Sequence, residues 1–218
     1  LGLEPDEATR ELHQQIHNAQ EQPARVAGEV RSSVPAALLH PPEQLVGRNR
    51  ELELLAGSGN RLVLISGEPG IGKTRLLTAR TPADTLYCRC LEGLELVPFH
   101  PLRNLIASRL DQGIPLPDLG QWRSDLELLL PGADHSEAGG GRSRLLEAAA
   151  LYLEHSGSVV LFDDLQWADT GTLELLLSLA ERDRPAVRGA FRAGAVGPGL
   201  RRTIADLPGA QLIRLEPL

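Results

Sequence analysis

The sequence predicts an α/β protein built on a doubly wound, parallel five-stranded sheet with helices on both faces, preceded by a short helix and a linker. Short apolar runs alternate with helix-compatible segments from residue 44 onward, which is typical of βαβ units. The first run leads into a glycine-rich loop and a later run ends in acidic residues, so both features fall at one edge of a parallel sheet. Apolar residues make up 42 % of the chain, which is ample for a core, although aromatic residues make up 3 %.

Residues 1–43 are predicted to form an appendage to this sheet. A helix is expected over 6–20, because Asp6 suits an N-cap and Leu12 and Ile16 are spaced four residues apart. Residues 21–43 contain four prolines and no sustained period, which is typical of a linker. The expected division is a helical segment over 1–20, a linker over 21–43 and an α/β domain over 44–218.

The elements of the α/β region follow from its apolar runs. A short amphipathic helix is expected at 50–55, before the first strand. The five strands are expected at 61–66, 85–90, 158–162, 187–191 and 211–215. The intervening helices are expected at 72–80, in pieces within 100–131, at 143–155 and at 170–181.

The most specific motif follows the first strand. Its candidate phosphate-binding residues are Gly67, Glu68, Pro69, Gly70, Ile71, Gly72, Lys73 and Thr74, with Arg75 adjoining them. The spacing G-x-x-x-x-G-K-T predicts a phosphate loop, whose backbone N–H groups surround the α- and β-phosphates while a lysine reaches the β- and γ-oxygens. Lys73 is the single lysine of the chain and every other cation is arginine, so it stands where a compact ammonium is required. The loop predicts binding of a nucleoside triphosphate.

The second constellation is the apolar run 159–162 followed by Asp163 and Asp164. Asp163 is the candidate Mg²⁺ ligand, acting through water opposite the Thr74 hydroxyl. Asp164 is the candidate group that orients or deprotonates an attacking water, although its side chain is one methylene shorter than the glutamate more usual there. The alternative interpretation is a strand that runs into an acidic turn.

The third candidate is Arg192, at the end of the strand expected at 187–191. A polar residue there can reach a γ-phosphate and report its presence. The alternative interpretation is a surface arginine at a strand end, in which case Arg201, Arg202 or Arg214 would take the role.

Charge and apolar patterning exclude several classes. The net charge of −7 argues against a nucleic-acid-binding surface on this chain. No apolar run approaches the roughly 18 residues that a membrane span needs, and no signal peptide is visible. Cys88 and Cys90 lack further ligands at zinc spacing and are expected to be reduced, half-buried thiols of a cytoplasmic protein.

Three segments together resemble a known family of regulators. They are Leu45-Val46-Gly47-Arg48, the loop 67–74, and the string 161–169 that contains Asp-Asp-Leu-Gln-Trp-Ala-Asp. They resemble the ATPase domain of STAND-class regulators, which are P-loop NTPases related to the AAA+ superfamily. The first residues and the helix after them are similar to the end of a bacterial transcriptional activator domain. The pairing resembles the SARP-type, large ATP-binding transcriptional regulators.

That resemblance implies functions for several residues. The backbone of Val46, Gly47 and Arg48 would hold the adenine of ATP or ADP, and Arg192 would be the sensor arginine. Contacts with DNA and RNA polymerase would belong to domains outside this chain, and a nucleotide-dependent oligomer is compatible with the family. The chain also departs from the family. Asn49 stands where glutamate is usual, and the segments Thr74–Leu86 and Leu173–Arg188 are short for their helices. The family's helical lid and winged helix would begin where the chain stops. These departures predict slow hydrolysis.

Two other functions remain open on the sequence. The phosphate loop and the paired aspartates also fit a small-molecule kinase, although nothing marks a substrate pocket. A folded but degenerate domain that serves as an interaction platform is the third possibility. No Asn-Lys-x-Asp motif is present to select guanine.

Overall fold

The structure is a computed structural model that describes residues 34, 35, 38, 45–57, 62–130, 141–207 and 209–217. The helix expected at 6–20 and most of the linker expected at 21–43 therefore lie outside the described residues. Residues 32–218 form one compact unit.

The described chain forms the parallel sheet that the sequence predicts. Its strands are β1 (Leu62–Gly67), β2 (Leu86–Arg89), β3 (Val159–Asp163), β4 (Ala186–Arg192) and β5 (Gln211–Arg214). They pair in the order β2-β3-β4-β1-β5, and every pairing is parallel. All five carboxyl ends therefore lie at one edge, with Gly67 level with Arg192 and Arg89 level with Asp163.

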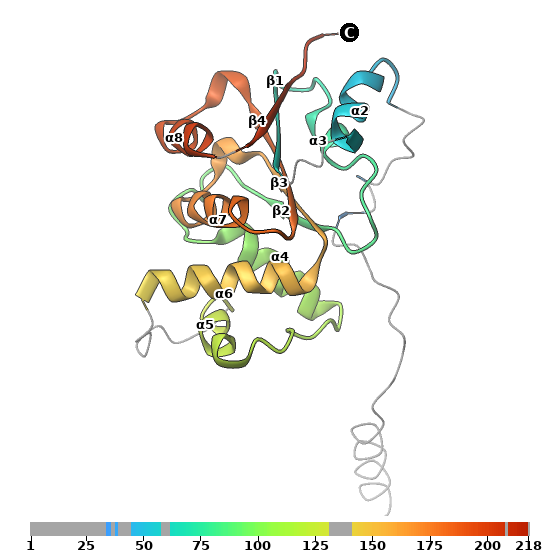
Figure 1. Cartoon of the computed structure of the whole chain (residues 1–218). Helices are drawn as coiled ribbons and strands as arrows, with labels where there is room; N and C mark the ends of the chain where they lie inside the picture. Colours follow the sequence, from blue (N-terminus) through green and yellow to red (C-terminus); the bar gives the residue numbers. More distant parts are fainter. Residues whose placement is uncertain are drawn as a thin grey trace, which may run out of the picture. The chain divides into compact units, whose positions relative to one another are not determined.

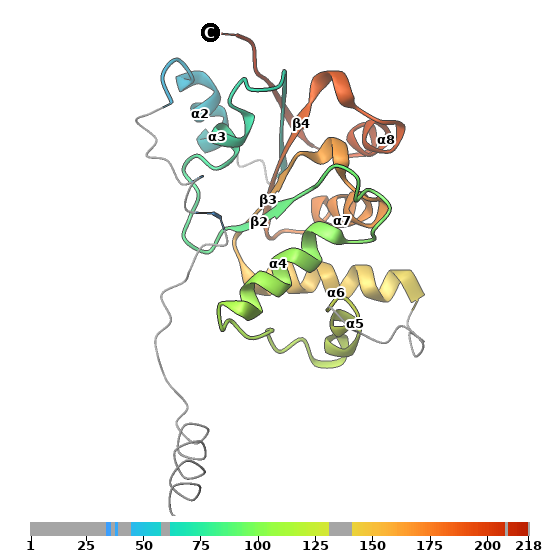
Figure 2. The same ribbon diagram turned by 180° about the vertical axis from the view of Figure 1, so that it is seen from behind.

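Helices cover both faces of the sheet (Figures 1 and 2). The α-helices are α2 (Asn49–Gly57), α3 (Lys73–Leu77), α4 (His100–Asp111), α5 (Arg123–Glu127), α6 (Gly141–Ser156), α7 (Thr170–Ala180) and α8 (Pro198–Asp206). Short 3₁₀ turns are η3 (Gly120–Trp122), η5 (Leu165–Trp167) and η6 (Ala193–Ala195). The doubly wound α/β prediction is confirmed.

Strand parity divides the core into two layers. Val63, Ile65 and Leu161 face one side, where they pack with Leu76 of α3 and Leu52 of α2. Their neighbours along the strands face the other side, toward α4, α5, α6, α7 and α8. The inner strand β1, which lies between β4 and β5, is buried along its whole length, as expected for an apolar strand in a parallel sheet.

The helix α8 was not predicted from the sequence. The region around it is rich in glycine and proline, which are poor helix formers. Pro198 instead occupies the first turn, where its missing N–H costs nothing. Leu200 and Thr203 are buried, and Gly199 lies close to Leu173 of α7. Tertiary packing therefore stabilises a helix that the local sequence does not predict.

The two cysteines correct another expectation. Cys88 and Cys90 face the same side of the sheet, as the spacing indicates, but they are fully buried rather than half-buried. They belong to the cluster that includes Leu102 and Ile106 of α4, so this helix covers the strand even though β2 is at the sheet edge.

Candidate functional site

The predicted phosphate loop joins β1 to α3 at the carboxyl edge of the sheet. Gly70 and Gly72 have φ angles of +76° and +98°, and a Cβ built on either would meet nothing within 4 Å. The space beside each of these two glycines is therefore open. At Gly67 the reason for glycine is close packing, because a Cβ there would lie 3.0 Å from Ile71 and 3.1 Å from the Leu215 carbonyl oxygen.

Lys73 begins α3 and is 8 % exposed. Its Nζ donates a 2.7 Å hydrogen bond to the carbonyl oxygen of Glu68, at the start of the loop. Burial lowers the pKa of the Lys73 ammonium, and the nearby Arg192 guanidinium lowers it further. The loop thus holds a partly desolvated cation beside its open glycines.

Asp163 ends β3 and is 3 % exposed. Its Oδ2 accepts hydrogen bonds from the Thr74 hydroxyl at 2.8 Å and from the Tyr87 hydroxyl at 2.9 Å. Its Oδ1 accepts from the backbone N–H of Asp164 at 3.0 Å. Burial raises the pKa of Asp163, while the hydrogen bonds from Thr74 and Tyr87 oppose that rise.

These residues fit a nucleotide with its magnesium ion. The chain offers a hydroxyl and a carboxylate oxygen side by side, which are the hard ligands that Mg²⁺ takes. Open glycines and a lysine at the start of a helix suit phosphate oxygens. Thr74 and Asp163 would hold the metal, and residues 67–74 would hold the phosphates. Arg75, the remaining predicted loop residue, lies exposed on α3.

Asp164 lies at the turn between β3 and η5. Its backbone is left-handed, with φ 56°, a conformation that aspartate tolerates better than most side chains. Its Oδ1 accepts a 2.9 Å hydrogen bond from Gln166, and its Oδ2 lies 3.6 Å from Nε of Arg89 at the end of β2. The predicted water-orienting carboxylate is therefore already in contact with two neighbours.

Arg192 ends β4, level with Gly67 of the phosphate loop. Its charge is close enough to Lys73 to affect the pKa of that residue. Its backbone N–H donates a 3.0 Å hydrogen bond to Oε1 of Gln166. The structure thus brings Lys73, Thr74, Asp163, Asp164 and Arg192 to the same edge of the sheet.

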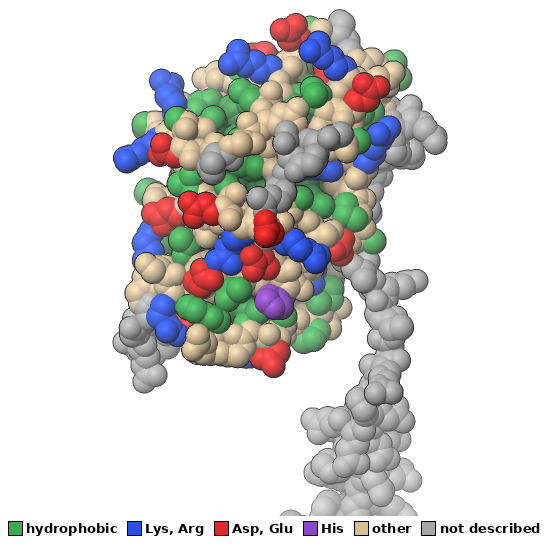
Figure 3. Space-filling model, viewed as in Figure 1, with side chains coloured by type: hydrophobic (Ala, Val, Ile, Leu, Met, Phe, Trp, Pro, Cys, Tyr) green, Lys and Arg blue, Asp and Glu red, His purple; other side chains and the backbone are tan. Residues whose placement is uncertain are grey.

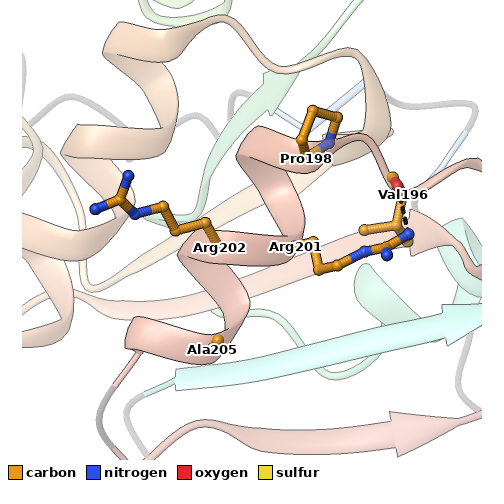
Figure 4. Close-up of a pocket in the computed structure, with 5 residues that line it drawn as sticks. All are labelled: Val196, Pro198, Arg201, Arg202 and Ala205. Atoms are coloured by element: carbon orange, nitrogen blue, oxygen red, sulfur yellow. Dashed lines mark hydrogen bonds between the residues drawn. The ribbon is translucent and has the colours of Figure 1, made fainter.

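The alternative arginines occupy other surroundings. Arg201 and Arg202 project in opposite directions from α8 beside a hollow of about 430 Å³ (Figure 4). Arg201 donates to the Val196 carbonyl oxygen at 3.4 Å, and Arg202 lies 3.8 Å from Asp206. Arg214 ends the edge strand β5.

The segment predicted to hold adenine precedes α2. Gly47 has a φ of +76°, and Val46 is 79 % exposed. The Arg48 side chain is buried and donates to the Glu216 carbonyl oxygen at 2.7 Å and to Glu51 at 3.1 Å. Arg48 therefore joins the segment to the chain after β5, which passes beside Gly67. A role in adenine binding rests on the backbone here and stays a prediction.

Sequence reasoning missed three residues around this edge, namely Tyr87, Arg89 and Gln166, and a fourth, Arg188, nearer the start of β4. Tyr87 and Arg89 alternate along β2 with the buried cysteines, so their side chains face the opposite side of the sheet, which α3 covers. This signal identifies them as site residues only when β2 is known to lie beside β3. Arg188 lies on β4 and donates to the Ala79 carbonyl oxygen at 3.0 Å, just after α3. Burial lowers the pKa of Arg188.

Known proteins that are similar to this chain include ATPases. One similar solved structure is the Walker-type ATPase PABY2304 of Pyrococcus abyssi, at 20 % identity and a TM-score of 0.44. The match covers 79 % of this chain and 54 % of that structure, so the chain spans about half the length of that protein. Among proteins with curated functions, none matches the chain. Residues 44–188, more than half of the chain, match the family described as AAA ATPase domain. This chain therefore contains an ATPase-type nucleotide-binding domain and belongs to the AAA ATPase domain family.

Proposed function

We propose that this chain is the Mg·ATP-binding regulatory switch of a bacterial transcriptional activator. The observation that carries the nucleotide part is the 2.8 Å hydrogen bond between Thr74 and Asp163, next to Lys73 and the open glycine loop. It joins a metal-ligating hydroxyl and carboxylate at the point where phosphates would lie. When bound, Mg²⁺ supplies positive charge that offsets the charge of the β- and γ-phosphates.

The residues at this edge have separate proposed functions. The backbone of residues 67–74 binds phosphate, and Lys73 moves from the Glu68 carbonyl oxygen to the β- and γ-oxygens. Arg192 contacts the γ-phosphate as a sensor. Asp164 orients the attacking water, and the backbone of residues 46–48 contacts adenine.

Hydrolysis is proposed to be slow. Asp164 is shorter than a glutamate, and its carboxylate already has Gln166 on one oxygen and Arg89 near the other. The helix α3 has five residues, which is short for a helix that follows a phosphate loop. A weak ATPase whose bound state matters more than its turnover suits a switch.

A contact behind the phosphate loop supports a regulatory role. Thr78 follows α3, and its hydroxyl donates to the Leu38 carbonyl oxygen at 3.0 Å. Val34 is buried in the same cluster as Leu76 and Leu77 of α3. A change of α3 on nucleotide binding would therefore reach Val34 and Leu38, which precede residues 44–218 in the sequence. We place DNA reading in a domain outside this chain and the protein in the cytoplasm.

Fluorescent mant-ATP titrations with and without Mg²⁺ test the nucleotide part. Saturable binding that tightens with Mg²⁺ is the expected result, and its absence would refute the proposal. Phosphate release with and without candidate acceptor molecules separates a switch from a kinase. Turnover below about 1 s⁻¹, at the low end of ordinary enzyme rates, is expected without any acceptor.

A further inference from the structure

Gln166 connects the two residues proposed to act on the γ-phosphate and on water. It lies in η5, two residues after Asp164, and its amide reaches the end of the adjacent strand β4. Nε2 donates to Oδ1 of Asp164 at 2.9 Å, and Oε1 accepts from the backbone N–H of Arg192 at 3.0 Å. One side chain therefore links the ends of β3 and β4.

The chemistry of the two contacts fixes the orientation of this amide. A carboxylate oxygen can accept a hydrogen bond but not donate one, and a backbone N–H can donate but not accept. The Gln166 amide supplies a donor to Asp164 and an acceptor to Arg192. If the amide were flipped, Oε1 would face the Asp164 carboxylate and the NH₂ group would face the Arg192 N–H, so neither hydrogen bond could form. Glutamate or methionine could not satisfy both neighbours.

Gln166 holds Asp164 more firmly than the other neighbour does. Arg89 approaches at 3.6 Å and its side chain is 60 % exposed, so solvent screens this ion pair. The Asp164 side chain is 19 % exposed, and its Oδ1 contact with Gln166 is a well-formed hydrogen bond. The direction of the carboxylate is therefore set mainly by Gln166.

We propose that Gln166 is a positioning residue that couples Arg192 to Asp164. This inference rests on the proposed function. A shift of the β4 end when Arg192 meets a γ-phosphate moves the Arg192 N–H, and Gln166 transmits that movement to the Asp164 carboxylate. The carboxylate then faces the attacking water when a triphosphate is present. Binding of ATP itself does not need the amide.

The contact itself is tested without nucleotide. Amide hydrogen exchange at Arg192 should be faster in Gln166→Met than in wild type, because the N–H loses its acceptor. Gln166→Glu keeps an acceptor for Arg192 while losing the donor to Asp164, so its Arg192 exchange should stay slow. Equal exchange in wild type and Gln166→Met would overturn the proposal, whatever the chain does with ATP.

The function of the contact is tested on the full 218-residue chain by mant-ATP affinity and single-turnover hydrolysis. Gln166→Met and Gln166→Glu should both lower the hydrolysis rate by about 10- to 100-fold, as expected for a misplaced catalytic group. ATP affinity should stay within about twofold, because the change removes no binding contact. Gln112→Met, at the exposed glutamine that follows α4 as its C-cap, is the matched control and should hydrolyse as wild type does.

A double-mutant comparison distinguishes positioning from general damage. If Gln166 acts through Asp164, adding Gln166→Met to Asp164→Asn should lower the rate no further. A further drop equal to that in the wild-type background would overturn the proposal. If wild type binds and hydrolyses ATP and the Gln166 variants hydrolyse it at the same rate, this inference alone is overturned. A wild-type chain that binds no ATP would refute the proposed function, and the coupling role with it.

Discussion

The Thr74 hydroxyl donates a 2.8 Å hydrogen bond to Asp163, which lies 89 residues further along the chain. The bond joins the first turn of α3 to the end of β3, on the side of the sheet that α3 covers. Tyr87 adds a second donor to the same oxygen. Because protein contacts hold both groups in place, the proposed metal site needs little rearrangement before it can act.

Lys73→Ala is expected to weaken ATP binding by about 10- to 150-fold, the value of one charge-assisted contact of about 1.5–3 kcal/mol. Lys73→Arg should also bind weakly, because a planar guanidinium cannot replace the compact ammonium inside the loop. Mant-ATP titration measures both, and circular dichroism checks that the fold is retained. Wild-type affinity in Lys73→Ala would contradict the assignment.

Asp163→Ala is expected to remove the gain in ATP affinity that Mg²⁺ provides while leaving Mg²⁺-free binding largely unchanged. The loop amides bind phosphate without the metal, whereas the carboxylate serves the metal. Tyr87→Phe is the matched control, because it removes a hydrogen bond to Asp163 but keeps the carboxylate. Titrations of mant-ATP at several Mg²⁺ concentrations measure the effect. If Asp163→Ala responds to Mg²⁺ as wild type does, Asp163 is a strand-end carboxylate without a metal function.

The sheet and the loop could be predicted because their signals are local. An apolar run followed by G-x-x-x-x-G-K-T identifies β1, the loop and α3, and an apolar run ending in Asp163 identifies β3. Strand boundaries deviate by one residue or so because hydrogen bonding, not hydrophobicity, ends a strand. The helix after the loop ends at Leu77, whereas the sequence predicts an end near Arg80. Arg80 itself has a left-handed backbone conformation.

The contacts that complete the site could not be predicted, because they depend on strand order. Nothing in the sequence says that β2 adjoins β3 and that β4 adjoins both β3 and β1. Without that order, Tyr87 is an aromatic residue in a strand and Gln166 a polar residue in a turn. The register of β2 against β3 places Tyr87 two residues before the partner of Asp163, on the same face.

Asp169, the last residue of the Asp-Asp-Leu-Gln-Trp-Ala-Asp string, is predicted to stabilise the fold rather than to bind nucleotide. It is 2 % exposed, caps α7, and accepts from the backbone N–H groups of Thr172 at 3.0 Å and Phe99 at 2.8 Å. Asp169→Ala leaves these buried donors unpaired and should lower the free energy of unfolding by about 2–5 kcal/mol. Urea unfolding measures the loss. Asp118→Ala, at an exposed loop residue, is the control and should change stability by less than about 1 kcal/mol.

Cys88 predicts a fall in stability at alkaline pH. Burial raises the pKa of its thiol to about 12, whereas an unfolded thiol titrates near roughly 8.5. The folded state therefore holds this proton more tightly than the unfolded state. The contribution of the neutral Cys88 thiol to the free energy of unfolding is fully present below roughly pH 8.5. It is lost as the pH rises toward about 12, by up to about 1.4 kcal/mol per pH unit.

Urea unfolding of wild type and Cys88→Ala between about pH 8 and 10 checks this slope. The variant loses a buried side chain and should be less stable throughout, but its stability should fall less steeply with pH. Parallel curves for the two proteins would show that the Cys88 thiol does not titrate differently on unfolding.

The last prediction is that this chain alone does not bind duplex DNA specifically. Phosphate contacts supply most of the affinity for DNA, and a net charge of −7 opposes them. On the face shown in Figure 3, acidic and basic side chains are interspersed rather than gathered into a basic stripe. Electrophoretic shift assays at about 50 mM salt are the demanding test, because electrostatic binding is strong there. The proposed function places DNA reading in another domain, so a protein that includes such a domain should bind where this chain does not. Sub-micromolar, sequence-dependent binding by these residues would show that the DNA-reading surface lies on the ATPase domain itself.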